Sequence, residues 1–138
     1  MAGDDTIEGR GGGDTICGNE GRDTIRGQAG NDSINSGDNV DPDVSGGDGI
    51  DSIHCGAFGD TCSGGNGGDF VDGDNGPDNV SGNADVDTLE DGLGATASDL
   101  LTGGTGIDTF NICNAAGEGA TITDPQVGET INVGPGFC

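Results

Sequence analysis

A nine-residue repeat runs through most of this chain, and it restricts the fold more than any other feature of the sequence. The clearest copy is GGNGGDFVD, from Gly64 to Asp72, and GGTGIDTFN, from Gly103 to Asn111, has nearly the same form. Twelve copies, the first of them partial, cover roughly the first 111 residues. A short fixed period predicts a stacked architecture in which every repeat contributes one small structural unit.

Two positions of the repeat are nearly constant. The sixth position is aspartate in eleven copies: Asp5, Asp14, Asp23, Asp32, Asp51, Asp60, Asp69, Asp78, Asp87, Asp99 and Asp108. The eighth position is apolar in all twelve: Ile7, Ile16, Ile25, Ile34, Val44, Ile53, Cys62, Val71, Val80, Leu89, Leu101 and Phe110. The Gly-rich first six positions predict a tight turn with positive φ. The last three positions, polar-apolar-polar, predict a very short strand with one inward side chain.

A strand of three residues buries too little apolar surface to be stable alone. Stacking such strands alternately on two sheets buries a continuous ladder of Ile and Val. Two repeats then form one coil of about 18 residues, and each turn lies above the turn two repeats away. The Asp side chains and Gly carbonyls of consecutive turns therefore face a common gap. Hard oxygen ligands in flexible coordination suit Ca²⁺, whereas Mg²⁺ prefers to keep its waters and zinc or copper prefers His or Cys.

The charge of the chain also requires bound cations. The formal net charge is −23, from 26 acidic residues against three Arg and no Lys. Such a composition favours a disordered, self-repelling chain unless the carboxylates are neutralised. The same charge argues against nucleic acid and anionic membrane surfaces as partners, since both require basic patches. No apolar run of about 18 residues is present, so we expect no membrane insertion.

The pattern GGxGxDxUx, in which U is apolar, resembles the RTX family of secreted bacterial proteins, and the likeness covers about four fifths of the chain. The resemblance implies an all-β fold, a right-handed parallel β-roll with Ca²⁺ held between adjacent turns. It implies that the chain folds when calcium binds, and that it is secreted and extracellular. It also implies that the eleven position-six aspartates are the carboxylate ligands, with turn carbonyls completing each shell.

Alternate repeats place these aspartates in two columns. The column from Asp14 to Asp108 is uninterrupted. In the other column Pro42 stands where aspartate is expected, after a one-residue insertion near residues 36–37. We expect the two sites beside Pro42 to be absent, weak, or supplied by Asp41 or Asp43.

A second insertion, of about three residues in the stretch 94–98, precedes Asp99 and weakens the expectation of a site between Asp78 and Asp99. The expected total is about six to nine calcium ions. Eight ions, for example, would contribute roughly +16 against the acidic charge of the chain.

The nine-residue rhythm ends after Asn111. Residues 120–125 and 129–133 are expected to form two strands, and they resemble the closing segment of RTX rolls, although Pro125 replaces the usual Phe. Residues 1–111 are therefore predicted to form the calcium-binding roll, and residues 112–138 a C-terminal cap that covers the last coil.

Five cysteines in a short chain favour an oxidising compartment. Cys113 and Cys138 flank the cap and form the preferred disulfide pair. Cys55 and Cys62 are a second candidate pair across one turn, although Cys62 also suits a buried apolar position. Cys17 has no evident partner and is expected to be free or to link two molecules.

No catalytic residues are predicted. His54 stands beside Cys55, but it occupies an outward repeat position and is the single His of the chain. Neither a nucleophile elbow nor a phosphate-binding loop is present. Outward threonines suggest ice binding as a minor alternative, although Asp43, Phe70, Asn79 and Leu100 interrupt their series.

Two biological roles remain open for such a roll. One is a structural or assembly rod that associates end to end or through an unpaired Cys into a filament or surface layer. The other is an accessory module of a larger secreted enzyme, toxin or adhesin. No signal-peptide pattern follows Met1, which fits a processed chain or part of a longer one. Calcium binding is common to both roles.

Overall fold

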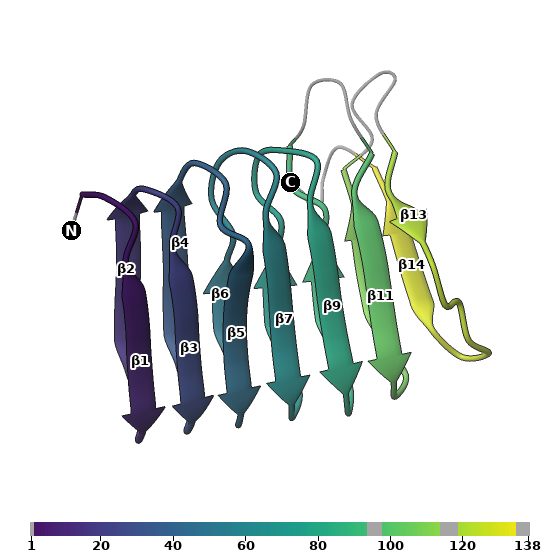
Figure 1. Ribbon diagram of the computed structural model, residues 1–138. Helices are drawn as coiled ribbons and strands as arrows, with labels where there is room; N and C mark the ends of the chain where they lie inside the picture. The colour runs from purple at the N-terminus through teal and green to yellow at the C-terminus, as the bar shows by residue number, and fades with distance from the viewer. Residues whose placement is uncertain (1, 94–97, 114–118, 135–138) are drawn as a thin grey trace.

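The computed structural model describes residues 2–93, 98–113 and 119–134, which form two parallel sheets of seven strands each (Figure 1). The first sheet has the order β1-β3-β5-β7-β9-β11-β13, with strands Thr6–Gly11, Thr24–Ala29, Asp43–Asp48, Thr61–Asn66, Asn79–Ala84, Leu100–Thr105 and Thr121–Ile122. The second has the order β14-β12-β10-β8-β6-β4-β2, with strands Thr130–Val133, Thr109–Ile112, Thr88–Glu90, Phe70–Asp72, Ser52–His54, Ser33–Asp38 and Thr15–Glu20. Consecutive strands alternate between the sheets, so two strands make one coil. The predicted parallel β-roll is confirmed.

Apolar side chains form one ladder inside each sheet. In the first sheet Ile25 pairs with Ile7 on one side and Val44 on the other, and the ladder continues in this register. Eleven of the twelve eighth-position residues are buried, and Ile7 is partly buried against them. One inward apolar side chain per strand is therefore enough to form a continuous core, because parallel stacking aligns it with its counterpart in the next coil.

Most strands are longer than the sequence predicts. Eight of them contain six residues, because the first three positions of the following repeat also pair with the neighbouring coil. Arg10, for example, pairs with Gln28, and both have positive φ, at 81° and 77°. The turn thus begins one residue into the repeat, while the backbone ladder continues past it. Only β6, β8 and β10 have the predicted length of three residues.

The insertion in the first column is Pro42 itself, so the predicted insertion near residues 36–37 is wrong. Gly37 still pairs with Asn19, exactly one coil of 18 residues away, whereas Asp43 pairs with Thr24. The additional residue therefore lies between these two points, after Asp41. Pro42 lacks an N–H, and the ladder bypasses it: the Thr61 N–H donates to the Asp41 carbonyl at 3.0 Å.

The strands after residue 111 continue the two sheets. β13 pairs with β11, and β14 pairs with β12, each in parallel register. The exposed fraction of Ile131 is 50%, so the second apolar ladder opens to solvent at its C-terminal end. The boundary between roll and cap at residues 111 and 112 remains a prediction. The described residues contain no helix with the length and apolar character needed to cross a membrane.

Candidate metal centre

The most regularly repeated geometry of the roll lies where each turn enters a strand. There the aspartates stack in two columns, and each backbone N–H donates to Oδ1 of the aspartate one coil further on. Ten such hydrogen bonds, of 2.7–2.9 Å, link Asp5-Asp23-Asp41-Asp60-Asp78-Asp99 and Asp14-Asp32-Asp51-Asp69-Asp87-Asp108. We call these series the first and the second column. All eleven predicted aspartates lie in them.

Asp41 is the twelfth member. Its carboxylate accepts the Asp23 N–H at 2.7 Å, and its own N–H donates to Asp60 at 2.7 Å. Asp41 therefore occupies the place that the sequence alignment gave to Pro42. The later insertion does not break the column either, because the Asp78 N–H donates to Asp99 at 2.7 Å.

The second carboxylate oxygen is the chemically important one. Within the described part of the chain, Oδ2 is buried and has no hydrogen-bond partner in every column aspartate but Asp99: Asp5, Asp14, Asp23, Asp32, Asp41, Asp51, Asp60, Asp69, Asp78, Asp87 and Asp108. An ionised oxygen buried without a partner is strongly unfavourable. The three Arg of the chain are all exposed, so no basic side chain compensates this charge.

At the first repeat position of most coils, glycine lets the backbone approach the aspartate carboxylate closely. A Cβ added to Gly46 would lie 2.2 Å from Asp51 Oδ2 and 2.7 Å from the Gly64 carbonyl oxygen of the next coil. At Gly64 the corresponding distance to Asp69 Oδ2 is 2.5 Å. A carboxylate oxygen and a backbone carbonyl oxygen of the next coil therefore approach the same point beside this glycine. A hard cation such as Ca²⁺ fits this donor set, which consists of oxygen alone.

The two columns differ at this first position. In the second column it is always glycine: Gly9, Gly27, Gly46, Gly64, Gly82 and Gly103. In the first column Ser36, Cys55 and Asp91 occupy it in three repeats. The Ser36 hydroxyl donates to the Cys55 carbonyl, so in this repeat a side chain stands where the second column has glycine backbone alone. The second column is thus the more regular one.

Burial changes the proton affinity of the column aspartates. It raises the pKa of Asp60, Asp78 and Asp87 to about 7, and that of Asp69 to about 6. The backbone N–H donors oppose this shift, and the neighbouring carboxylates of the column add to it. Near neutral pH these groups therefore bind protons unless a cation neutralises them.

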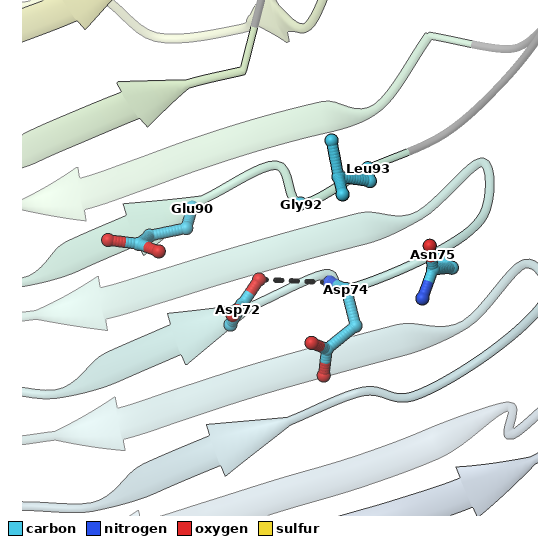
Figure 2. A pocket seen from close by; sticks show the side chains of 6 residues that line it. All are labelled: Asp72, Asp74, Asn75, Glu90, Gly92 and Leu93. Atoms are coloured by element: carbon cyan, nitrogen blue, oxygen red, sulfur yellow. Dashed lines mark hydrogen bonds between the residues drawn. The ribbon is translucent and has the colours of Figure 1, made fainter. Parts of the chain in front are cut away.

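A separate acidic pocket lies outside the columns. It has a volume of about 110 Å³ and is lined by Asp72, Asp74, Asn75, Glu90, Gly92 and Leu93 (Figure 2). Figure 2 shows the hydrogen bond from the Asp74 N–H to Asp72 Oδ1, which measures 2.9 Å.

His54 joins this group, with Nδ1 at 3.5 Å from Asp72 Oδ2 and 3.4 Å from Asp74 Oδ2. The sequence places His54 outward but does not reveal these two contacts, which depend on the pairing of β6 with β8. Burial raises the pKa of Asp72, and the nearby carboxylates of Asp74 and Glu90 add to the effect. The side chains of this cluster contact one another at a surface that opens to solvent, which explains their arrangement without an ion.

The structure contains the second of the two disulfide pairs suggested by the sequence. Cys55 and Cys62 form a disulfide with a Cα–Cα distance of 6.3 Å, connecting the end of β6 with β7 and therefore the two sheets. The preferred pair, Cys113 with Cys138, includes a residue outside the described ranges. Among the described cysteines, Cys17 is free and exposed.

The outward threonines do not form one surface. β1, β3 and β7 of the first sheet begin with Thr6, Thr24 and Thr61, whereas Thr15 and Thr88 begin strands of the second sheet. The series is therefore divided between two opposite faces. No observation on either face favours ice binding.

A parallel roll with oxygen-lined gaps between its coils defines a cation-binding β-solenoid. The model of the RTX calcium-binding nonapeptide repeat matches four stretches, residues 1–25, 9–41, 63–95 and 93–111, which together include more than half of the chain. The chain belongs to this family. The unmatched stretch between residues 41 and 63 contains the Pro42 insertion and the Cys55–Cys62 disulfide. None of the curated proteins and none of the solved structures matches the chain.

Proposed function

We propose that this chain binds several Ca²⁺ ions between its coils and that the twelve column aspartates supply the carboxylate ligands. The observation that carries the proposal is the series of buried Oδ2 atoms without partners. Except in Asp5 and Asp14, which begin the two columns, each belongs to a carboxylate whose orientation is already fixed by a backbone N–H bound to Oδ1. Carbonyl oxygens of the adjacent coil, such as that of Gly64 beside Asp51, complete the donor set.

The number of ions follows from the columns. Each column of six aspartates has five intervals between consecutive coils. We expect all five intervals of the second column to bind calcium, because its series of aspartates is unbroken and its first repeat position is always glycine. We expect fewer in the first column, where Ser36, Cys55 and Asp91 replace glycine. The total remains about six to nine ions.

Calcium binding and folding are coupled in this proposal. The unfolded chain keeps its carboxylates hydrated and apart, whereas the roll places them in close columns with no basic side chain among them. Bound Ca²⁺ supplies the positive charge that offsets repulsion and desolvation. A ligand that binds only the folded state shifts the equilibrium toward that state.

The direct test is a calcium titration of chelator-treated protein, followed by far-UV circular dichroism and sedimentation on the same samples. We expect a transition from coil to β-structure with several ions bound per chain. A cooperative, fully folded roll in excess chelator would contradict the proposal.

For the biological role, we propose a secreted, extracellular structural rod. In this proposal a second copy pairs with β1 and β2, the edge strands of the two sheets, since strand edges are templates for further pairing. The exposed thiol of Cys17 lies on β2 of the same coil. The Cys55–Cys62 disulfide supports an oxidising environment. Sedimentation distinguishes the roles: growth into large species with calcium supports assembly, whereas a strictly monomeric roll supports an accessory module of a larger secreted protein.

A further inference from the structure

The turn of the C-terminal cap stacks on the turn of the last repeat. The Thr130 N–H donates to the Asp108 carbonyl at 2.9 Å, as the Thr109 N–H does to Asp87 at 2.8 Å one coil earlier. The Gln126 side-chain amide donates to the Gly104 carbonyl. A methyl group added at Gly128 would lie 3.7 Å from Ile107 Cδ1. The cap therefore continues the stacking of turns beyond the last nine-residue repeat.

Glu129 occupies the column position in this cap turn. Because Thr130 pairs with Thr109, the residue before it stands where Asp108 stands one coil earlier. Its Oε2 atom accepts the Gln126 N–H at 2.6 Å. Its Oε1 atom is buried and has no hydrogen-bond partner among the described residues. One carboxylate oxygen of Glu129 is held by a backbone N–H of its own turn, not by the column residue one coil earlier as in the aspartates, and the other oxygen is without a partner as in the aspartates.

The first column ends differently. The Thr121 N–H donates to the Asp99 carbonyl at 2.8 Å, so Ala120 holds the corresponding position there. The acid that follows that cap strand, Asp124, accepts the Gly103 and Gly104 N–H groups at 3.0 and 2.8 Å, one with each carboxylate oxygen. The cap therefore extends the second column, but not the first, with an acid that has an unpartnered oxygen.

We propose that Glu129 is the terminal ligand of the second column and that it binds one additional Ca²⁺ together with the turn that ends at Asp108. This inference rests on the proposed function of the columns and extends it to the cap. The additional ion fastens β14 to the roll, so docking of the cap becomes dependent on calcium. No repeat-based alignment includes this site, because Glu129 lies outside the nine-residue pattern.

The test compares the whole chain with its Glu129→Gln variant in saturating calcium. Native mass spectrometry counts the bound ions, and hydrogen exchange follows the amides of Thr130–Val133. We expect one ion fewer in the variant and at least about ten-fold faster exchange in β14, a factor that corresponds to about 1.4 kcal/mol. Exchange in β8 and β10 should be unchanged, which shows that the roll itself remains folded.

Asp124→Asn is the matched control, because it removes a cap carboxylate whose two oxygens already have partners. It should keep the wild-type number of ions. An unchanged ion count in Glu129→Gln would overturn the inference, and so would unfolding of the whole roll, since a terminal site is not needed by the coils before it. Failure of the proposed function would give a different result, because the wild-type chain itself would then not bind several calcium ions.

Discussion

The backbone N–H of Asp69 donates a 2.8 Å hydrogen bond to Oδ1 of Asp87, while Oδ2 of Asp87 is buried without a partner. The protein therefore fixes the direction of the carboxylate and leaves half of its charge uncompensated. Repeated along both columns, this arrangement leaves many buried carboxylate oxygens uncompensated in a chain of net charge −23, which is the reason for the proposal that bound cations stabilise the compact roll.

Asp41 and Asp43 provide a test of the ligand assignment within three residues. Asp41 is buried in the first column, whereas Asp43 lies outside it and forms an exposed ion pair with Arg26. We expect Asp41→Asn to raise the calcium concentration at the folding midpoint by about ten-fold, because a charged ligand becomes neutral. Asp43→Asn should shift it little, since exposed ion pairs contribute about 0–1 kcal/mol. Circular dichroism measures both midpoints during a calcium titration. Equal shifts in the two variants would contradict the assignment of Asp41, and not Asp43, as the calcium ligand.

Gly64 should tolerate no side chain. Alanine there would place Cβ 2.5 Å from Asp69 Oδ2, inside the gap assigned to calcium. We expect Gly64→Ala to lower the free energy of unfolding in saturating calcium by about 1–3 kcal/mol and to remove at least one ion. Gly119→Ala is the control, since no atom lies within 4 Å of the added methyl group. Thermal denaturation and ion counting check both variants, and a wild-type ion number in Gly64→Ala would argue against the gap as the binding position.

The calcium-free roll should be more stable at pH 5 than at pH 8. Burial raises the pKa of Asp60, Asp78 and Asp87 from 3.8 to about 7, so between these values the folded state binds more protons than the unfolded chain. The free energy of unfolding therefore falls as the pH rises through this window. Circular dichroism of calcium-stripped protein should show more β-structure at pH 5. With calcium present, more of the metal should be needed at pH 5, because protons compete for the same oxygens. If the calcium concentration at the folding midpoint were the same at pH 5 and pH 8, competition between protons and calcium would be contradicted.

The Cys55–Cys62 disulfide should stabilise the middle of the stack. It closes a short loop, with a sequence separation of 7, between the two sheets. Replacing both cysteines with alanine should lower the free energy of unfolding in calcium by about 2 kcal/mol. Cys17→Ala should leave it unchanged, because that thiol is exposed and free. Denaturant titration compares the variants, and an unaffected double variant would mean that the bond constrains the chain little.

Much of this fold is readable from the repeat. Period nine with one apolar residue per unit determines that Ile25 stacks between Ile7 and Val44, because no other arrangement buries these side chains together. Asp14 to Asp108 were assigned to one column for the same reason. Strand length was less predictable, since the pairing of Arg10 with Gln28 depends on a neighbouring coil and not on local residue type.

The residues at the irregular positions of the repeat could be assigned only from the three-dimensional structure. An extra residue can be placed on either side of an aspartate without changing the pattern, and only the hydrogen bond from Asp23 shows that Asp41, not Pro42, belongs to the column. The nine-residue pattern does not identify Glu129, the ligand we propose in the cap, because the cap has no nine-residue frame to count from. The contacts of His54 with Asp72 likewise depend on which strands are neighbours.

The hydrogen bonds along each column all point the same way, from the N–H of one coil to the carboxylate of the next. Within a column, each coil thus offers an aspartate N–H to the coil that follows it in the chain and a carboxylate to the coil before it, while the Thr24 N–H and its counterparts donate in the opposite direction. The columns are therefore polar. The two faces of any one coil are chemically unequal, so a coil stacked in the reverse direction would not continue the column.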